Sequence, residues 1–148
     1  IVTVDVVEIA QAILFLMERG KMVAEGAGAA PVAAIMNRKF DVSGKVAAVI
    51  SGGNIDVTMI SRIIEKGLLR AGRMTKLRIL MQDRPGQLEM ASRIIAAEGA
   101  NVMVVHHDRT DVDLDIRDAI LEITMETQDR KHAQRVIDAL RAGGFQVS

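Results

Sequence analysis

The sequence predicts two folds in one chain of 148 residues, an α/β segment over residues 1–74 and a small α+β domain over residues 75–148. In the first segment, apolar residues with helical spacing surround one continuous apolar run. In the second, strand and helix rhythms follow one another in the order βαββαβ. We place the domain boundary in the polar, glycine-containing stretch 70–74 that separates these rhythms.

Composition limits the class of protein. Apolar residues make up 49% of the chain, and the 19 basic residues balance the 19 acidic ones, so we expect a buried core and no nucleic-acid partner. The absence of cysteine excludes disulfides and thiolate chemistry and suits the cytoplasm. No apolar stretch approaches the roughly 20 residues of a membrane span. The start, Ile-Val-Thr-Val, lacks a methionine and a targeting signal, so we expect the interior of a longer chain.

Residues 5–19 and 24–37 have the patterns of two helices. In the first, apolar residues recur every three or four positions, and Asp5 and Glu8 have the spacing of a capping box. The second is rich in alanine and contains Pro31. A proline there predicts either a position in the first turn or a kink in a closely packed helix.

Residues 45–50 form a continuous apolar run, which predicts a strand buried on both faces of a parallel sheet, and helical spacing returns over residues 55–69. Between them lies the turn Ser51-Gly52-Gly53-Asn54. Ligands of open α/β sheets bind at the carboxyl ends of strands, and glycines there let a flat or phosphorylated ligand approach the backbone. On spacing alone, a glycine-rich turn that binds nothing is an equal alternative.

In the second domain, strands are predicted at 76–81, 101–107, 119–126 and 145–147, and helices at 86–98 and 130–142. This order is typical of the ferredoxin-like fold, in which two helices cover one face of a four-stranded antiparallel sheet. A unit of about 70 residues has a marginal core. We therefore expect a homo-oligomer, with one contact through this sheet and another through the first segment.

Three stretches carry a resemblance to a known family. They are Ala24-Glu25-Gly26-Ala27-Gly28-Ala29-Ala30, the segment from Val46 to Asp56, and Asp83-Arg84-Pro85-Gly86. Together they resemble the carboxy-terminal end of the fold-type II, pyridoxal-phosphate-dependent threonine dehydratases that carry a single ACT regulatory domain. The resemblance covers essentially the whole chain. It implies that the first segment is the tail of a catalytic domain and that the second is an ACT domain, which mediates a dimer.

The resemblance implies one wall of a coenzyme site. The family's serine that matches Ser51 hydrogen-bonds the pyridine nitrogen of pyridoxal phosphate, and a glutamate that matches Glu25 lies close to the ring. Gly52, Gly53 and Asn54 complete the turn. A neutral hydroxyl at the nitrogen favours elimination of water from threonine or serine more than a carboxylate does. For Glu25, a solvated carboxylate at a helix entrance is a nearly equal alternative.

Other parts of the family's catalytic site match nothing in this chain. They are the Schiff-base lysine, the loop that holds the cofactor phosphate and the loop that holds the substrate carboxylate. The chain's own lysines lack the matching context, and we interpret them as surface residues: Lys21, Lys39, Lys45, Lys66, Lys76 and Lys131. We therefore expect the chain alone to be inactive and to lack the cofactor that the full-length enzyme binds.

The turn that follows the first strand of the second domain is the candidate effector site. Proline presets the first position of a helix, and glycine lets a small carboxylate reach free N–H groups. The resemblance implies that this turn binds an amino acid, isoleucine or valine, together with strand residues of a partner subunit. Asp83 suits the ligand's ammonium group, and Asn101 suits its carboxylate or the backbone of a partner subunit. The predicted residues are Asp83, Arg84, Pro85, Gly86, Gln87, Leu88, Asn101 and Val102.

Two alternatives stay open. One is a capped turn at a dimer seam that binds nothing. The other is a free-standing ACT-type sensor or oligomerisation module in which residues 1–74 are only a scaffold. An RNA-binding domain of the same topology is disfavoured, because the strands at 76–81 and 101–107 lack aromatic residues for base stacking.

The histidines and the acidic loop predict no metal site. His106 and His107 are neighbours on a strand and point to opposite faces. His132 lies in a polar helical turn, and we expect it to be exposed. The acidic loop lacks the glycine and glutamate of an EF-hand, and we interpret its carboxylates as solvated: Asp108, Asp111, Asp113 and Asp115.

Overall fold

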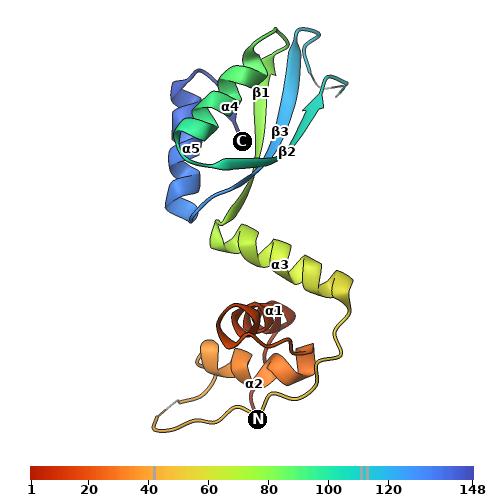
Figure 1. Ribbon diagram of the computed structural model, residues 1–148, viewed down its shortest axis with the longest axis vertical. Helices are drawn as coiled ribbons and strands as arrows, with labels where there is room; N and C mark the ends of the chain where they lie inside the picture. The colour runs from red at the N-terminus through yellow and green to blue at the C-terminus, as the bar shows by residue number, and fades with distance from the viewer. Residues whose placement is uncertain (42, 111, 113) are drawn as a thin grey trace. The chain divides into compact units, whose positions relative to one another are not determined.

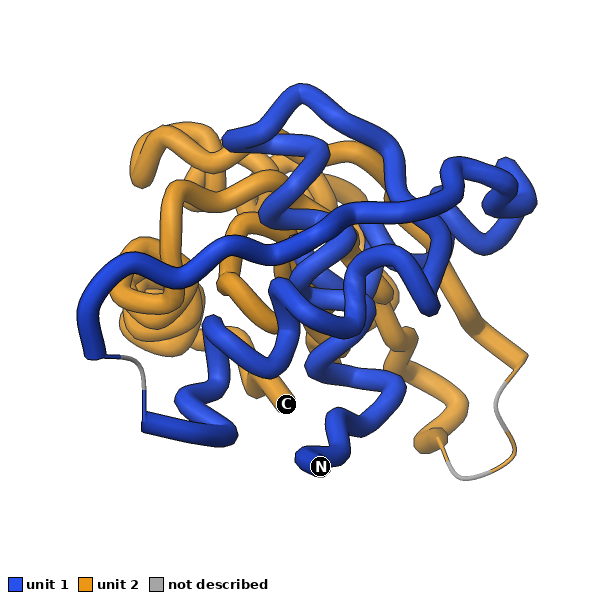
Figure 2. The backbone as a smooth tube through the Cα atoms, turned by 90° about the horizontal axis from the view of Figure 1, so that it is seen from below, with its two compact units in different colours: residues 1–67 blue, residues 68–148 orange. Residues whose placement is uncertain are grey.

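A computed structural model describes residues 1–41, 43–110, 112 and 114–148. The chain divides into two compact units, residues 1–67 and residues 68–148, which Figure 2 shows in blue and orange. We call them unit 1 and unit 2. Asp111 and Asp113, two carboxylates of the acidic loop, lie outside the described residues.

Unit 1 is built from helices. Helix α1 spans Val6–Phe15 and continues into the π-helical turn η1, Leu16–Gly20. Helix α2 spans Gly26–Met36, and helix α3, Val57–Ala71, begins in unit 1 and ends in unit 2. These bounds confirm the three helices that the sequence predicts in the first segment.

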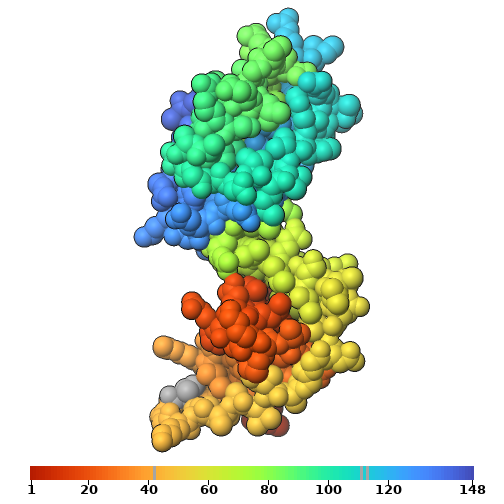
Figure 3. Space-filling view, viewed as in Figure 1, coloured from red at the N-terminus to blue at the C-terminus, as the bar shows by residue number. Residues whose placement is uncertain are grey.

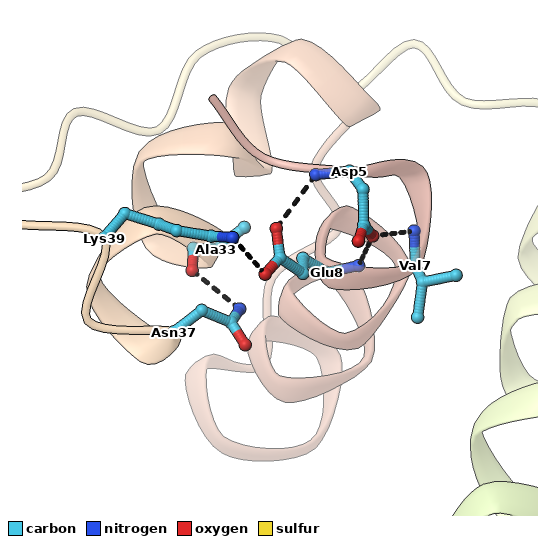
Figure 4. Close-up of polar contacts among 6 residues, drawn as sticks. All are labelled: Asp5, Val7, Glu8, Ala33, Asn37 and Lys39. Atoms are coloured by element: carbon cyan, nitrogen blue, oxygen red, sulfur yellow. Dashed lines mark hydrogen bonds and ion pairs between the residues drawn. The ribbon is translucent and has the colours of Figure 1, made fainter. Parts of the chain in front are cut away.

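The predicted capping box at the start of α1 is confirmed (Figure 4). Asp5 Oδ1 accepts hydrogen bonds from the backbone N–H groups of Val7 and Glu8, both at 2.8 Å. Glu8 Oε2 accepts one in return from the Asp5 N–H at 2.9 Å. The other Glu8 oxygen lies 2.6 Å from Lys39 Nζ, beyond the end of α2. The start of α1 is thus linked to the segment that follows α2.

Small side chains let α1 and α2 pack closely. The buried cluster of unit 1 is rich in alanine and consists of Ala12, Ile13, Leu16, Ala24, Ala29, Ala33 and Ile63. Pro31 lies inside α2, beyond its first turn, and its side chain faces solvent. Because proline has no N–H, the Ala27 carbonyl loses its partner four residues later in the helix. The helix persists because its alanine face is buried against α1.

The predicted strand at residues 45–50 is wrong. This stretch has no regular secondary structure, and its side chains are exposed or half-buried, with Val49 78% exposed. Figure 1 shows it within the long connection between α2 and α3, and Figure 3 shows the yellow connection on the surface. A strand needs a neighbour to complete its ladder of hydrogen bonds. Among the described residues, none pairs with this run.

Unit 2 has the predicted element order βαββαβ. Its strands are β1 (Met74–Gln82), β2 (Asn101–Asp108), β3 (Asp118–Glu126) and β4 (Gln146–Val147). Its own helices are α4 (Gln87–Ala97) and α5 (Arg130–Ala142). The strands form one antiparallel sheet in the order β2-β3-β1-β4. Strands β1 and β2 are both antiparallel to β3, so they run in the same direction. Their carboxyl ends therefore lie at the same end of the sheet.

Both helices of unit 2 cover one face of the sheet (Figure 1). Alternate residues of β1 and β3 point toward them, as the two-residue period of a strand requires. The core contains Leu77, Ile79, Met81, Ala91, Ile95, Ala119, Leu121, Ile123, Met125, Val136, Leu140 and Phe145. On the opposite face, charged side chains pair across strands, as in the 3.2 Å contact between Arg78 and Glu122.

The end of α3 is joined to the start of α5 by hydrogen bonds to backbone carbonyls. Arg130 donates through Nε and Nη2 to the Arg70 carbonyl, at 3.1 and 2.7 Å. The Thr127 hydroxyl donates to the Gly72 carbonyl at 2.6 Å, and its N–H donates to the Arg73 carbonyl at 3.0 Å. Gly72 has a positive φ of 68°, and a Cβ there would lie 2.6 Å from the Arg130 backbone nitrogen. This position therefore needs glycine.

His132 is buried, so the expectation that it is exposed is wrong. Only 2% of its surface is accessible. Its Nδ1 accepts a hydrogen bond from the Gln128 N–H at 3.0 Å, which leaves the ring proton on Nε2. Nε2 lies 2.8 Å from the Glu98 carbonyl oxygen, so it donates to that oxygen. The imidazole thus connects the start of α5 with the end of α4, and both of its nitrogens are satisfied.

Candidate functional site

The structure brings the two glycine-containing motifs of unit 1 together. The Glu25 N–H donates to the Gly52 carbonyl at 3.2 Å. A Cβ at Gly28 would overlap the backbone of Ser51, and a Cβ at Gly52, whose φ is 74°, would overlap the Glu25 carboxylate. Glycine is therefore needed at both positions for the start of α2 to meet this turn.

Four of the five predicted cofactor residues meet in this contact. Gly53 approaches the Val23 carbonyl, since a Cβ there would lie 3.3 Å from that oxygen. Asn54 follows in the same turn, and Ser51 through Asn54 are exposed. Glu25 is half-buried and precedes α2 without capping it through its side chain. Among the described residues, none forms a hydrogen bond with the Ser51 hydroxyl.

These features fit the coenzyme that the family resemblance implies. The Cβ sides of Gly28 and Gly52 are filled by the Ser51 backbone and the Glu25 carboxylate, so these glycines let the two motifs pack together and place Ser51 beside Glu25. The Ser51 hydroxyl is exposed and able to donate a hydrogen bond. The six lysines of the chain are exposed, as expected of surface residues.

The candidate effector turn of unit 2 lies between β1 and α4. The residue that precedes α4 is Gly86, with a φ of 90°. Pro85 therefore comes before the cap, not at the first helical position that the sequence suggested. The Asp83 N–H donates to the Arg117 carbonyl at 2.7 Å, and the Arg84 N–H donates to the Gln82 carbonyl at 2.9 Å. Asp83 through Gly86 and Leu88 are exposed, and Gln87 is half-buried.

Asp83 has two neighbours that the sequence did not indicate as site residues. Arg109 Nε lies 3.1 Å from Asp83 Oδ2, and His107 Nε2 lies 3.8 Å from Asp83 Oδ1. The second distance is too long for a hydrogen bond. His107 Nε2 is buried and has no hydrogen-bond partner among the described residues. The predicted topology could have indicated these neighbours. Strands β1 and β2 run in the same direction, so the residues that end them lie at the same end of the sheet.

Asn101 and Val102 do not meet this turn within one chain. They lie at the start of β2, at the opposite end of the sheet, where Asn101 is paired with Glu126 and Val102 with Met125. Asn101 Nδ2 donates to Glu126 Oε2 at 3.0 Å.

Other acidic residues stabilise turns and helix starts. Hydrogen bonds from the Thr58 hydroxyl and N–H lower the pKa of Asp56, which precedes α3. The Thr110 N–H and hydroxyl likewise lower the pKa of Asp108. Within the described ranges, no group of three or more histidine or acidic residues could hold a metal ion. Nor is any helix there long and apolar enough to cross a membrane.

Curated proteins match the chain over nearly its whole length. The protein named L-threonine ammonia-lyase of Thermotoga maritima is 51% identical over 147 residues, which are 99% of this chain and 36% of that protein. Its namesake in Geobacter sulfurreducens is 45% identical over 148 residues, 37% of its length. A catabolic L-threonine dehydratase of Staphylococcus aureus is 51% identical over 65 residues, 41% of this chain and 19% of that protein.

Other resemblances are weaker. No protein-family model matches the chain. A solved structure from Galdieria sulphuraria, titled an unknown protein, covers 71% of this chain and 75% of its own, with 14% identity and a TM-score of 0.40. A formyltetrahydrofolate deformylase from Pseudomonas putida covers 51% of this chain and 27% of its own, with 10% identity and a TM-score of 0.38. Neither score supports an argument.

The chain spans little more than a third of the two L-threonine ammonia-lyases that it matches, 36% and 37% of their lengths. The identity nevertheless extends across both units, since 99% of the chain is covered. By sequence, therefore, the chain corresponds to the carboxy-terminal part of proteins named L-threonine ammonia-lyase, with 45–51% identity to them.

Proposed function

We propose that the chain supplies two parts of a cytoplasmic threonine ammonia-lyase, which converts threonine to 2-oxobutyrate and ammonia. Residues 1–74 form one wall of the pyridoxal phosphate site, and residues 75–148 form an ACT domain of ferredoxin-like fold that binds an effector amino acid. The close approach of Gly28 to Ser51 and of Gly52 to Glu25 carries the proposal for the first part. Two distant stretches of sequence meet there and place Ser51, which is exposed, beside Glu25.

In the proposed pyridoxal phosphate site, each residue of this chain has a separate role. Pyridoxal phosphate, when bound, supplies the electron sink for loss of water and ammonia from threonine. Ser51 donates a hydrogen bond to the pyridine nitrogen and keeps the ring less electron-withdrawing than a carboxylate would. Gly52, Gly53 and Asn54 would complete the turn that presents Ser51, and Gly52 lets that turn pack against Glu25. Glu25 borders the ring from the start of α2. Because the Schiff-base lysine has no counterpart here, the chain alone is inactive.

The effector site of the proposal needs a second copy of unit 2. Strand β2 lies at an edge of the sheet and exposes Met103, Val104 and Val105 by 47%, 57% and 39%. An open edge with apolar side chains favours pairing with another strand. When two copies of β2 pair antiparallel about a two-fold axis, the start of one strand lies beside the end of the other. This arrangement brings Asn101 and Val102 of one copy to the turn Asp83–Leu88 of the other.

The proposed ligand of this turn is isoleucine or valine. Asp83 is the only acidic side chain of the turn and suits the ligand's ammonium group. The Gln87 N–H already donates to the Arg84 carbonyl at 3.3 Å, so the carboxylate would take the N–H groups that follow in the first turn of α4. Leu88, 40% exposed, offers an apolar surface to a branched side chain.

A second candidate function is a sensor that acts without a catalytic partner. Unit 2 has its own core, and the members of that core are all residues of unit 2. A domain with a separate core can fold and bind independently.

A chimaera tests the first part of the proposal. This chain replaces the matching part of the Thermotoga maritima protein, and 2-oxobutyrate formation from threonine is measured. We expect the chimaera to be active and Ser51→Ala to lower kcat, because the coenzyme loses its hydrogen-bond donor. Ser61→Ala, an exposed position on α3, is the matched control and should leave kcat unchanged. Equal rates for the two variants would contradict the proposed role of Ser51.

Titration calorimetry of the isolated chain tests the second part. We expect isoleucine or valine to bind saturably and Asp83→Asn to weaken that binding. The same chain, incubated with pyridoxal phosphate and threonine, should form no 2-oxobutyrate. Turnover by the isolated chain would overturn the proposed inactivity.

A further inference from the structure

We infer that Asp56 is a positioning residue for Ser51. Its carboxylate fixes the start of α3, and the start of α3 in turn fixes the turn that presents the Ser51 hydroxyl to the coenzyme. This inference rests on the proposed role of Ser51 in the pyridoxal phosphate site. It assigns to the reaction a residue outside that turn, which acts only through Ser51.

The carboxylate of Asp56 holds the first turn of α3. Its Oδ1 accepts hydrogen bonds from the Thr58 N–H at 2.7 Å, from the Thr58 hydroxyl at 2.5 Å and from the Met59 N–H at 3.4 Å. The Asp56 carbonyl accepts a helical bond from the Ile60 N–H at 3.0 Å. Asp56 therefore has both features of a helix N-cap, a side-chain oxygen on N–H groups of the first turn and a carbonyl already bonded within the helix.

The turn that contains the candidate coenzyme residues has few anchors of its own. The Gly52 carbonyl accepts a hydrogen bond from the Glu25 N–H at 3.2 Å, and the Gly53 carbonyl accepts one from the Ile55 N–H at 3.0 Å. Ile50 and Ile55, which flank the turn, are half-buried against the apolar cluster of unit 1. The four turn residues are exposed, so their conformation depends on the segments that precede and follow them.

Helix α3 is a firm support for this turn, because it is itself fixed within unit 1. Ile63 is a buried member of the apolar cluster of that unit. A Cβ at Gly67 would overlap a methyl group of Leu14, so glycine lets α3 lie close to α1. Only two residues separate the coenzyme turn from the first residue of α3. The capped end of the helix therefore sets the direction in which the chain leaves the turn.

Loss of the Asp56 carboxylate leaves N–H groups of the first turn of α3 without their acceptor, and the start of the helix frays more readily. The chain that follows the coenzyme turn then gains freedom, and Ser51 spends less time where it can donate to the pyridine nitrogen. A misplacement of about 1 Å can lower a rate by about a hundredfold. The loop that holds the substrate carboxylate in the family has no match in this chain, so KM for threonine should change less than kcat.

The chimaera with the Thermotoga maritima protein tests this inference through a double-mutant cycle. We expect Asp56→Ala to lower kcat by about threefold or more, and Asp56→Asn to restore most of the loss, because asparagine caps helices as well as aspartate does. The double variant of Ser51→Ala and Asp56→Ala should be no slower than Ser51→Ala alone. Both single variants should shift the absorption spectrum of the bound coenzyme in the same direction, since both weaken one hydrogen bond.

Hydrogen exchange of the isolated chain tests the same link without coenzyme. In Asp56→Ala, the Ile55 N–H that bonds to the coenzyme turn should exchange at least about threefold faster. Asp5→Ala is the matched control, because Asp5 caps α1 in the same unit through two N–H groups at 2.8 Å. It should leave the exchange of Ile55, kcat and the coenzyme spectrum unchanged. Asp56 is exposed, so its replacement leaves the core intact.

The outcomes separate this inference from the function on which it rests. If Ser51→Ala leaves kcat unchanged, the proposed role of Ser51 is wrong and the inference is wrong with it. If Ser51→Ala is slow and Asp56→Ala is not, or if their losses add in the double variant, only the inference is wrong. If Asp5→Ala lowers kcat as much as Asp56→Ala does, loss of a helix cap anywhere in unit 1 explains the effect, and Asp56 has no positioning role.

Discussion

The two units bury their apolar residues differently. Of the largest fully buried side chains, all eight belong to unit 2: Ile79, Ile95, Leu121, Ile123, Met125, Leu140, His132 and Val136. Thirteen of the nineteen exposed large apolar side chains of the described residues belong to unit 1. Unit 2 therefore resembles a finished domain, whereas unit 1 has surface that suits contact with more protein. This difference agrees with the proposal that unit 1 is the tail of a larger catalytic domain.

The largest expected effect compares two buried leucines, one from each unit. Leu121→Ala should lower the free energy of unfolding of unit 2 by about 3–4 kcal/mol, because its core is closed and cannot collapse around the cavity. Leu16→Ala should cost unit 1 less, about 2 kcal/mol, since that side chain lies among small residues. Native-state hydrogen exchange measures both units separately. Equal losses would remove the energetic distinction between the units.

The next effect concerns the buried imidazole of unit 2. His132→Ala should cost about 2 kcal/mol, because the Gln128 N–H and the Glu98 carbonyl lose their partner in a buried place. Urea denaturation followed by circular dichroism gives the value. His106→Ala, on an exposed strand position, should change stability little and provides the comparison. If the two substitutions behave alike, His132 does not stabilise unit 2 in the way described.

The smallest expected effect depends on pH. Asp129 caps α5 by accepting a hydrogen bond from the His132 N–H at 2.8 Å, and that bond lowers its pKa. A lowered pKa in the folded state means that the cap stabilises unit 2 fully above about pH 4 and loses this effect as the pH falls further. Asp129→Ala should therefore be less stable than the unchanged chain at pH 7, and the difference should shrink in acid. Asp138→Ala, an exposed helical position, should show a smaller and less pH-dependent difference.

The elements of the chain could be predicted where their own side chains determine them. The capping residues of α1 and the alternating apolar residues of β1 and β3 are local signals, and the structure agrees with them. The strand expected at residues 45–50 failed because a strand depends on a neighbour, which is not a local property. The prediction that His132 is exposed was wrong for a related reason. Its burial depends on Glu98, which precedes it by thirty-four residues.

The candidate sites were predictable only in part. The family resemblance indicated Glu25, Ser51 and Gly52, and these residues lie together in the structure. It also indicated Asp83 but not His107 or Arg109, because these residues reach Asp83 only through the parallel course of β1 and β2. A single histidine or arginine at the end of a strand has no distinctive spacing. Topology, and not motif, identifies such residues.

The joint between α3 and α5 has a consequence for how such chains diversify. Arg130 and Thr127 donate hydrogen bonds to the backbone carbonyl oxygens of residues 70, 72 and 73, and every amino acid has such a carbonyl. The joint therefore requires particular side chains at the donor positions, residues 127 and 130. Among the acceptor positions only Gly72 is restricted, and the side chains of residues 70 and 73 are free to vary. A domain joined in this way can follow helices of unrelated sequence without a redesigned junction.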